Sequence, residues 1–289
     1  MLLSIALVSI LVQPAAPPAM PADYAAFMKA VEKTGDFKDG VLKINIPRTD
    51  LRVTISGRLV PTPLGFGGWL ALTPAEGGSH VMMGDLVLTE GEVNPVMTAL
   101  LDNNLDVTAL HNHFFHEEPR IFYLHVHGMG SAADLARRVR PALTLIGKSS
   151  PPPLGPVPVE KIDGAPVAAI VGHEGEYSGA VYKITIGRPD IDLRAHGARI
   201  TARMGLNTWA AFAGTNASAV VAGDVAMLEH ELTPVLKALR KHGLDIVAIH
   251  HHMTSVQPMV VFLHYYGQGD AAMLARGVRA ALDELGKRR

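Results

Sequence analysis

The chain carries two versions of one histidine-rich stretch, DVTALHNHFFHEEPRIFYLHVH at 106–127 and DIVAIHHHMTSVQPMVVFLHYY at 245–266. In each version a strand-like run ends in His-x-His, a short loop containing a proline follows, and a second apolar run carries another histidine. This pattern predicts a β-hairpin. Nine of the 14 histidines lie in the two stretches, and His242 just precedes the second. We therefore expect any chemistry to centre on these hairpins.

The sequence around the hairpins is duplicated as well. Residues 106–143 and 245–282 align without a gap and are identical at 18 of 38 positions. Because chance does not produce such agreement, we expect two repeats that share one fold. The expected organisation is a signal-peptide-like segment, a first repeat, a proline-rich linker and a second repeat, at 1–22, 23–147, 148–160 and 161–289.

Each repeat is expected to be α+β. Short alternating segments predict strands, and Ser131 predicts the start of a helix after the first hairpin. The helix before the hairpin begins either at the capping box Thr89-x-x-Glu92 or at Asn94-Pro95. This order predicts a mostly antiparallel sheet with two helices flanking the hairpin. We favour a packed pair of repeats over two separate beads, because a duplicated pair often mimics a homodimer.

The composition limits the possible functions. A content of 48% hydrophobic and 18% charged residues is typical of a globular protein with a full core. The 26 basic and 27 acidic residues nearly balance, so no surface for nucleic acid is indicated. The absence of cysteine excludes disulfides and thiolate-bound metals. The expected partner is a small molecule or a metal ion, and not nucleic acid.

The N-terminus resembles a secretory signal. Residues 1–12 form an apolar run too short to span a bilayer, and alanines and prolines follow it. The usual basic residues before the run are missing, and Met20 is an alternative start for a leaderless chain. We expect a periplasmic or secreted protein, with no membrane anchor after cleavage because no cysteine can carry a lipid.

The histidines of the first hairpin suit a metal ion. If the loop centres on residue 118, His111 lies opposite His125, and His113 shares their face because side chains repeat every second residue. Glu117 or Glu118 of the loop would add a carboxylate. Three imidazoles and a carboxylate suit divalent zinc, manganese, iron or copper. The expected metal ligands are His111, His113, Glu117 and His125.

The second repeat keeps the three histidines but loses the acidic loop. The equivalents of the first-repeat ligands are His250, His252 and His264, whereas Val256 and Gln257 replace the two glutamates. If only one site works, we expect it to be the first.

Several functions are compatible with this site. An open coordination position would make it catalytic through a metal-activated water, with Glu118 as the general base and His116 or His127 as an accessory proton carrier. Arg120 and His127 are the ligand-binding candidates, although Arg120 could simply pair with a glutamate. Alternatively, the repeats hold a small ligand between them without catalysis, or the histidines are inert in a structural or partner-binding protein.

The residues also resemble a known family. GGWLALTP…VMMGDLVLTEGEVNPVMTALLDNNLDVTALHNHFFHEEPRIFYLHVHG is similar to the LppY/LpqO-type family of bacterial exported proteins, a domain of unknown function, and the second half resembles the family's other copy. The resemblance covers residues 25 to about 285. It implies an extracytoplasmic location but no reaction. The acidic-Pro-Arg loop of the family matches residues 117–120 and has no match in the second copy.

Overall fold

The structure, a computed structural model, describes residues 19–148 and 160–287. Most of the expected leader, up to residue 18, lies outside the described residues, and so does the expected linker between 149 and 159. Among the helices of the described part, none combines the length and the apolar composition that a membrane crossing requires.

Each repeat forms a six-stranded antiparallel sheet. The first sheet has the strand order β1 (Gly35–Lys38), β2 (Val41–Pro47), β5 (Gly67–Pro74), β6 (His80–Thr89), β9 (Ile121–Gly130) and β7 (Asp106–His111). The second sheet has the equivalent order β10 (Glu176–Ser178), β11 (Val181–Gly187), β14 (Asn207–Gly214), β15 (Ala219–Leu228), β17 (Val260–Gly269) and β16 (Asp245–His250). The predicted α+β class and the duplication are confirmed.

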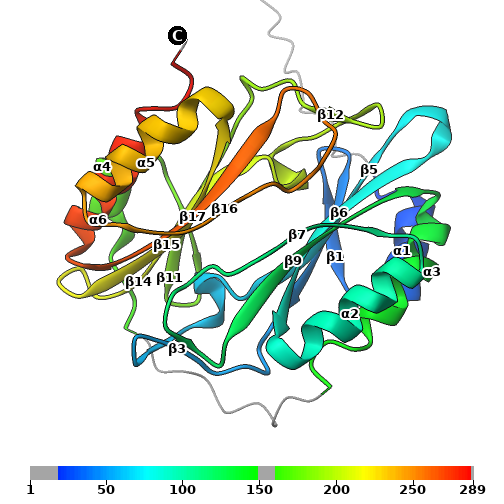
Figure 1. Cartoon of the computed structure of the whole chain (residues 1–289), viewed down its shortest axis with the longest axis horizontal. Helices are drawn as coiled ribbons and strands as arrows, with labels where there is room; N and C mark the ends of the chain where they lie inside the picture. The colour runs from blue at the N-terminus through cyan, green and yellow to red at the C-terminus, as the bar shows by residue number, and fades with distance from the viewer. Residues whose placement is uncertain (1–18, 149–159, 288–289) are drawn as a thin grey trace, which may run out of the picture.

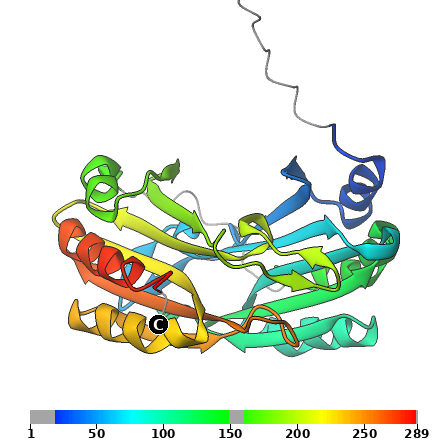
Figure 2. The same ribbon diagram turned by 90° about the horizontal axis from the view of Figure 1, so that it is seen from above.

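Helices cover the outer face of each sheet, and the strands lie between the two helical layers (Figures 1 and 2). The helices of repeat 1 are α1 (Ala22–Val31), α2 (Glu90–Asp102) and α3 (Ala132–Leu143), and those of repeat 2 are α4 (Gly164–Val171), α5 (Leu232–Lys241) and α6 (Ala271–Leu282). The sequence did not predict α1 and α4. Helix α2 begins at the capping box of Thr89 and Glu92, so the alternative start at Asn94-Pro95 is wrong.

The alternation of side chains along the strands separates an outer core from an inner face. In β9, Leu124 and Val126 pack with Leu135 and Val139 of α3 in the outer core of repeat 1. Tyr123 belongs to a different cluster, which contains residues of both repeats. Since successive side chains point to opposite faces, the odd-numbered residues of β9 face the other repeat.

Each repeat extends a short two-stranded segment, here called its arm, that packs on the sheet of the other repeat. The arm of repeat 1 contains β3 (Val53–Ile55) and β4 (Arg58–Val60), and its apolar residues pack with the inner face of the second sheet. The arm of repeat 2 contains β12 (Arg194–Ala195) and β13 (Ala198–Arg199), and it packs on the first sheet in the same way. The two repeats are therefore a packed pair with two mixed apolar cores.

A buried ion pair fastens the outer helix to the sheet in each repeat. Arg48, which is 2% exposed, lies 2.6 Å from Glu92 of α2 and donates to the carbonyl oxygen of Val87 at 2.7 Å. In repeat 2, Arg188 lies 2.9 Å from Glu231 and donates to the carbonyl oxygen of Ala226. Each arginine also pairs with an aspartate two residues further along the chain, Arg48 with Asp50 at 2.7 Å and Arg188 with Asp190 at 2.8 Å. Removing the glutamate therefore takes away the more deeply buried of two carboxylates.

We expect Glu92→Ala to lower the free energy of unfolding by about 3 kcal/mol, because Arg48 stays buried with Asp50 as its remaining carboxylate and α2 loses its capping box. Chemical denaturation measures the change. Glu32, which pairs with Arg140 at the surface, provides the control, and Glu32→Ala should cost less than about 1 kcal/mol. Equal losses in the two variants would contradict a structural role for the buried pair.

Candidate metal centre

The first hairpin places histidines on the inner face of its sheet. The ring centroids of His111 in β7 and His125 in β9 are 5.1 Å apart. His111 pairs with Tyr123 and His125 with Ala109, so the prediction that His111 lies directly opposite His125 is wrong. The loop centres on residue 117 and not on residue 118. The partner of His111 is therefore Tyr123, two residues before the expected His125. A move of two residues preserves the face, and both rings still point inward.

The second hairpin repeats this geometry on the facing sheet. His252 stacks on Phe262 at a centroid distance of 3.4 Å, just as His113 stacks on Tyr123 at 3.2 Å. His250 pairs with Phe262 across the β16–β17 ladder. An aromatic ring of the return strand therefore supports the second histidine of each His-x-His motif.

The packed repeats bring both sets of histidines into one histidine cluster, which consists of His111, His113, His125, His250, His252 and His264. Their rings contact each other across the boundary between the repeats. Two pairs are stacked, His111 with His250 at a centroid distance of 3.8 Å and His125 with His252 at 4.2 Å. The rings of His113 and His264 are tilted at a centroid distance of 3.6 Å. The sequence assigned these residues to two equivalent sites, one in each hairpin. The structure instead places all of them at the boundary.

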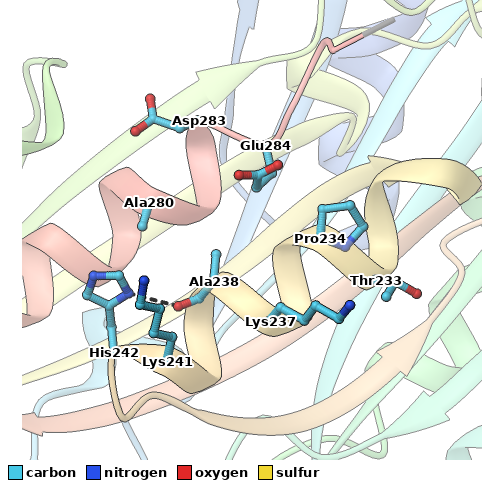
Figure 3. Close-up of a pocket in the computed structure, with 9 residues that line it drawn as sticks. All are labelled: Thr233, Pro234, Lys237, Ala238, Lys241, His242, Ala280, Asp283 and Glu284. Atoms are coloured by element: carbon cyan, nitrogen blue, oxygen red, sulfur yellow. Dashed lines mark hydrogen bonds between the residues drawn. The ribbon is translucent and has the colours of Figure 1, made fainter. Parts of the chain in front are cut away.

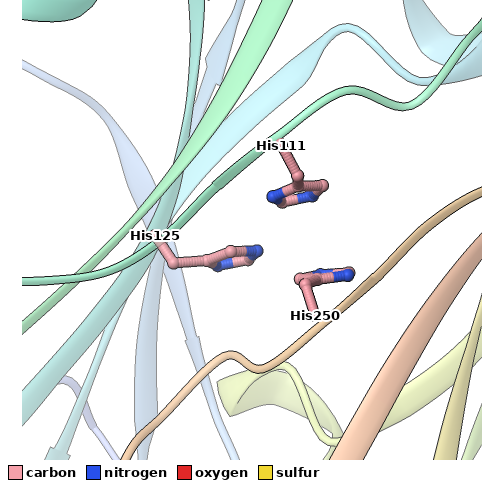
Figure 4. Close-up of side chains that lie close together, drawn as sticks. All are labelled: His111, His125 and His250. Atoms are coloured by element: carbon pink, nitrogen blue, oxygen red, sulfur yellow. The ribbon is translucent and has the colours of Figure 1, made fainter.

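Three groups of side chains at the cluster bring potential ligand atoms within 4.8 Å of one another. They are His111, His125 and His250; His111, His113 and His264; and Asp224, His250 and His252. The first two groups draw residues from both repeats. Figure 4 shows the first group, whose three rings lie in nearly parallel planes with His111 above His250.

Most ring nitrogens of the cluster have no hydrogen-bond partner within the described part of the chain. Nine buried nitrogens share this property: both nitrogens of His111, His113 and His250, Nε2 of His125 and His264, and Nδ1 of His252. His264 shows how one of them is oriented. Its Nδ1 donates to the carbonyl oxygen of Gly223 at 3.2 Å, which leaves the Nε2 lone pair of a neutral ring directed into the cluster.

The cluster favours neutral imidazoles. Burial lowers the pKa of every histidine in it, and the neighbouring histidines lower it further for most of them. For His252, burial lowers the pKa to about 3. Neutral imidazole is the form that binds metal ions.

Two aspartates, and not the loop glutamates, accompany the histidines. Asp85 pairs with His125 across the β6–β9 ladder, and Asp224 pairs with His264 in the second sheet. An oxygen of Asp224 lies 3.6 Å from Nε2 of His252. Burial raises the pKa of Asp85 to about 8, helped by the charge of Asp224, and burial raises the pKa of Asp224 to about 6.

The loop glutamates belong to none of the three ligand groups. The short strand β8 (Glu117–Glu118) turns away to pair with β3 of the arm, and Glu118 is exposed. Glu117 is buried and accepts from the backbone N–H of Ile121 at 3.1 Å. Burial raises its pKa to about 7. Pairing with the arm, which the sequence did not predict, explains why this loop leaves the histidines.

The two residues predicted to bind a ligand also lie outside the cluster. Arg120 is exposed and lines a surface pocket of about 340 Å³ with Glu117 and His116. His127 lines a separate pocket of about 240 Å³, and its ring lies 5.6 Å from that of His196. Burial lowers the pKa of His127 to about 4.

A cleft of about 470 Å³ opens beside the histidine cluster and is lined by both repeats. His113, His252 and His264 reach it from the cluster. Equivalent residues of the two repeats form much of its lining: Lys43 and Lys183, Trp69 and Trp209, Gly65 and Gly205, and Asp85 and Asp224. The cleft therefore follows the same internal symmetry as the histidines.

The aspartates and the lysines of this site were not among the residues that the sequence assigned to it. Asp85 stands in the middle of the apolar run HVMMGDLVLT, and Asp224 stands in the middle of AVVAGDVAML. A charged residue at the same place in two buried strands was the available signal. Lys43 and Lys183 offered a similar signal, because each is the only charged residue of its strand.

The fold and the site define a class: a duplicated α+β protein with a buried histidine cluster between its repeats. The chain belongs to the family described as Domain of Unknown Function (DUF1259), whose sequence profile matches residues 25–145 and 165–284. The two matches correspond to the two repeats. No curated protein matches the chain.

Solved structures give weak similarities. The trimeric bacterial microcompartment shell protein PduB aligns with 13% identity over 88% of this chain and 90% of that chain, with a TM-score of 0.22. EtuB from Clostridium kluyveri aligns with 10% identity over the same shares, also with a TM-score of 0.22. TM-scores this low support no conclusion about fold or assembly.

The metal-free protein should lose stability as the pH falls below 6.5, the ordinary pKa of histidine. Below this pH the unfolded chain binds more protons than the folded chain. The free energy of unfolding then falls by about 1.4 kcal/mol per pH unit for each imidazole that is protonated only in the unfolded chain. Above pH 6.5 this contribution is constant. Asp85, Asp224 and Glu117 have raised pKa values and give the opposite slope, but the histidines outnumber them.

Denaturation with a chelator present, at several pH values from 8 down to 4, measures this dependence. The account predicts a clear decrease in the free energy of unfolding below pH 6.5. An unchanged value down to pH 5 would contradict a buried cluster of neutral imidazoles.

Proposed function

We propose that this protein binds a divalent transition metal between its two repeats, with ligands from both. The observation that carries the proposal is the set of nine buried ring nitrogens without hydrogen-bond partners in the described residues. Each unpaired buried polar group costs about 1–3 kcal/mol. A bound cation offsets several such costs at once, whereas a proton on these rings is disfavoured by burial.

The ligand chemistry indicates which ions fit. Imidazole nitrogens suit zinc, copper, iron and nickel, and a carboxylate at the edge widens the range to manganese. The core of the proposed site is His111, His125 and His250, the group that spans the boundary in Figure 4. His113, His252, His264 and Asp224 supply alternative or additional ligands. The loop residues Glu117 and Glu118 have no part in this revised site.

The surroundings of the cluster are suited to catalysis. The cleft is lined by His113, His252 and His264 and not by the core group. A metal that binds one of these three histidines and keeps an open position would therefore face a space large enough for a small substrate. Such a metal supplies a Lewis acid and an activated water. Asp85 and Asp224 lie at the same place and could accept a proton.

Export is part of the proposal and rests on the sequence. The apolar residues 1–12, the alanines and prolines after them, and the resemblance to the LppY/LpqO-type exported proteins support a periplasmic or secreted location. Mass spectrometry of the mature protein would test it. A mature N-terminus near residue 22 is expected, and an intact Met1 on protein from the cytoplasm would contradict export.

The metal content of the protein, purified without an affinity tag, tests the proposal. We expect about one metal per chain and a loss of metal affinity of about 10-fold or more in both His111→Ala and His250→Ala, because each removes a ligand from the core group. The exposed His173 provides the control, and His173→Ala should leave the content unchanged.

His250→Ala is the informative variant. If it keeps the affinity of the wild type while His111→Ala loses it, the metal belongs to the first hairpin alone, and the proposed site at the boundary is wrong. If the wild type binds no metal and shows no thermal stabilisation with added zinc, copper, manganese or iron, the protein is not a metalloprotein.

A further inference from the structure

The cleft beside the histidine cluster contains two lysines that the proposed metal centre does not use. Lys43 lies on β2 and Lys183 lies on β11, at equivalent positions of the two sheets. The Nζ atom of Lys43 is 4.7 Å from the ring centroid of Trp69, and that of Lys183 is 4.2 Å from Trp209. Both lysines and both tryptophans line the same cleft. Each half of the cleft therefore contains a lysine ammonium group over the ring of a tryptophan.

These ammonium groups lack close counter-ions. In the described chain, no carboxylate lies within 4.0 Å of Lys43 or Lys183. Burial lowers the pKa of both lysines to about 8, and the charge of Lys183 contributes to the shift of Lys43. Two like charges that face one partly buried space are costly unless an anion joins them.

The aspartates of the cleft act on the lysines without forming ion pairs with them. Asp224 accepts from the backbone N–H of Leu263 at 3.1 Å through Oδ1, and its Oδ2 faces His252. Asp85 is 8% exposed, lies next to His125 in the sheet, and its Oδ1 has no hydrogen-bond partner within the described residues. The charge of Asp85 opposes the lowering of the pKa of both lysines, and the charge of Asp224 does so for Lys183. Both ammonium groups can still contact a ligand directly, because neither is held in an ion pair in the described chain.

We infer that the cleft binds a small dianion, a carboxylate or phosphate compound, between Lys43 and Lys183 with one end at the histidine cluster. The paired lysines match two negative charges, Asn45 and Thr185 add hydrogen-bonding groups, and the volume of about 470 Å³ suits a small organic molecule. The inference extends the proposed function, because it names the class of substrate that would meet the metal. The role of the anion as a substrate rests on the proposed metal centre. Binding of the anion does not, because the lysines can bind it without a metal.

A second lysine-bearing groove on the protein provides a matched control. It lies between α5 and α6 on the outer surface and carries Lys237 and Lys241 (Figure 3). Both of these lysines are exposed, and the groove also contains Asp283 and Glu284. Solvent screens the two exposed charges, so this groove should bind a dianion more weakly than the partly buried cleft.

Tryptophan fluorescence reports directly on the cleft, because Trp69 and Trp209 are the only tryptophans in the sequence. The probes are inorganic phosphate, succinate and the neutral succinamide, each added at constant ionic strength. Titrations are run on chelator-treated protein and on zinc-loaded protein. We expect a saturable response to phosphate or succinate in both forms and none to succinamide. Phosphate alone would identify a phosphate compound as the ligand class, and succinate alone a dicarboxylate.

The variant Lys43→Met/Lys183→Met should weaken anion binding at least about tenfold, since it removes both charges but keeps the side-chain volume. Each single variant should give an intermediate loss, which keeps the test valid if the double variant folds poorly. Lys237→Met/Lys241→Met should bind like the wild type. Metal content is measured on the same samples, so a failed metal centre is recognised separately from a failed anion site.

Two results would overturn the inference. The first is an unchanged anion affinity in folded Lys43→Met/Lys183→Met. The second is the absence of a saturable response to both anions in the metal-free and the zinc-loaded protein.

Discussion

The structure depends on the burial of six imidazoles between two sheets. Histidine is seldom buried in such numbers without hydrogen-bond partners, because each unpaired nitrogen carries a cost of about 1–3 kcal/mol. The exchanged arms make this burial possible: their apolar residues build one mixed core beside Tyr123 and another beside Phe262. The cores hold the sheets face to face, and the histidine cluster lies between the sheets.

Internal duplication explains where the site lies. Each repeat presents the same inner face, so the packed pair resembles a homodimer with a self-complementary contact. His111 stacks on its own counterpart, His250, and the lysines and aspartates of the cleft occur in equivalent pairs. The loop at 116–118 lies outside the site, which explains how HEE in the first repeat corresponds to SVQ in the second while the histidines stay. Neither repeat contains the complete histidine cluster by itself.

The sequence predicted what depends on local periodicity and missed what depends on packing between the repeats. The alternation of side chains predicted that His111 and His125 share one face, and the fold class followed from the order of the predicted strands and helices. The assignment of Glu117 as a ligand rested on sequence proximity to His113, but pairing of β8 with the arm removed it. Asp85 was not among the predicted site residues, because only the β6–β9 ladder places it beside His125.

The most direct test of the account is a crystal structure of the zinc-loaded protein with anomalous diffraction recorded at the zinc edge. The account predicts a peak in the histidine cluster, about 2.0–2.1 Å from ring nitrogens of at least one histidine in each repeat, with His111 and His250 among them. A peak bound by the first hairpin and Glu117 alone, or no peak among the six histidines, would contradict it.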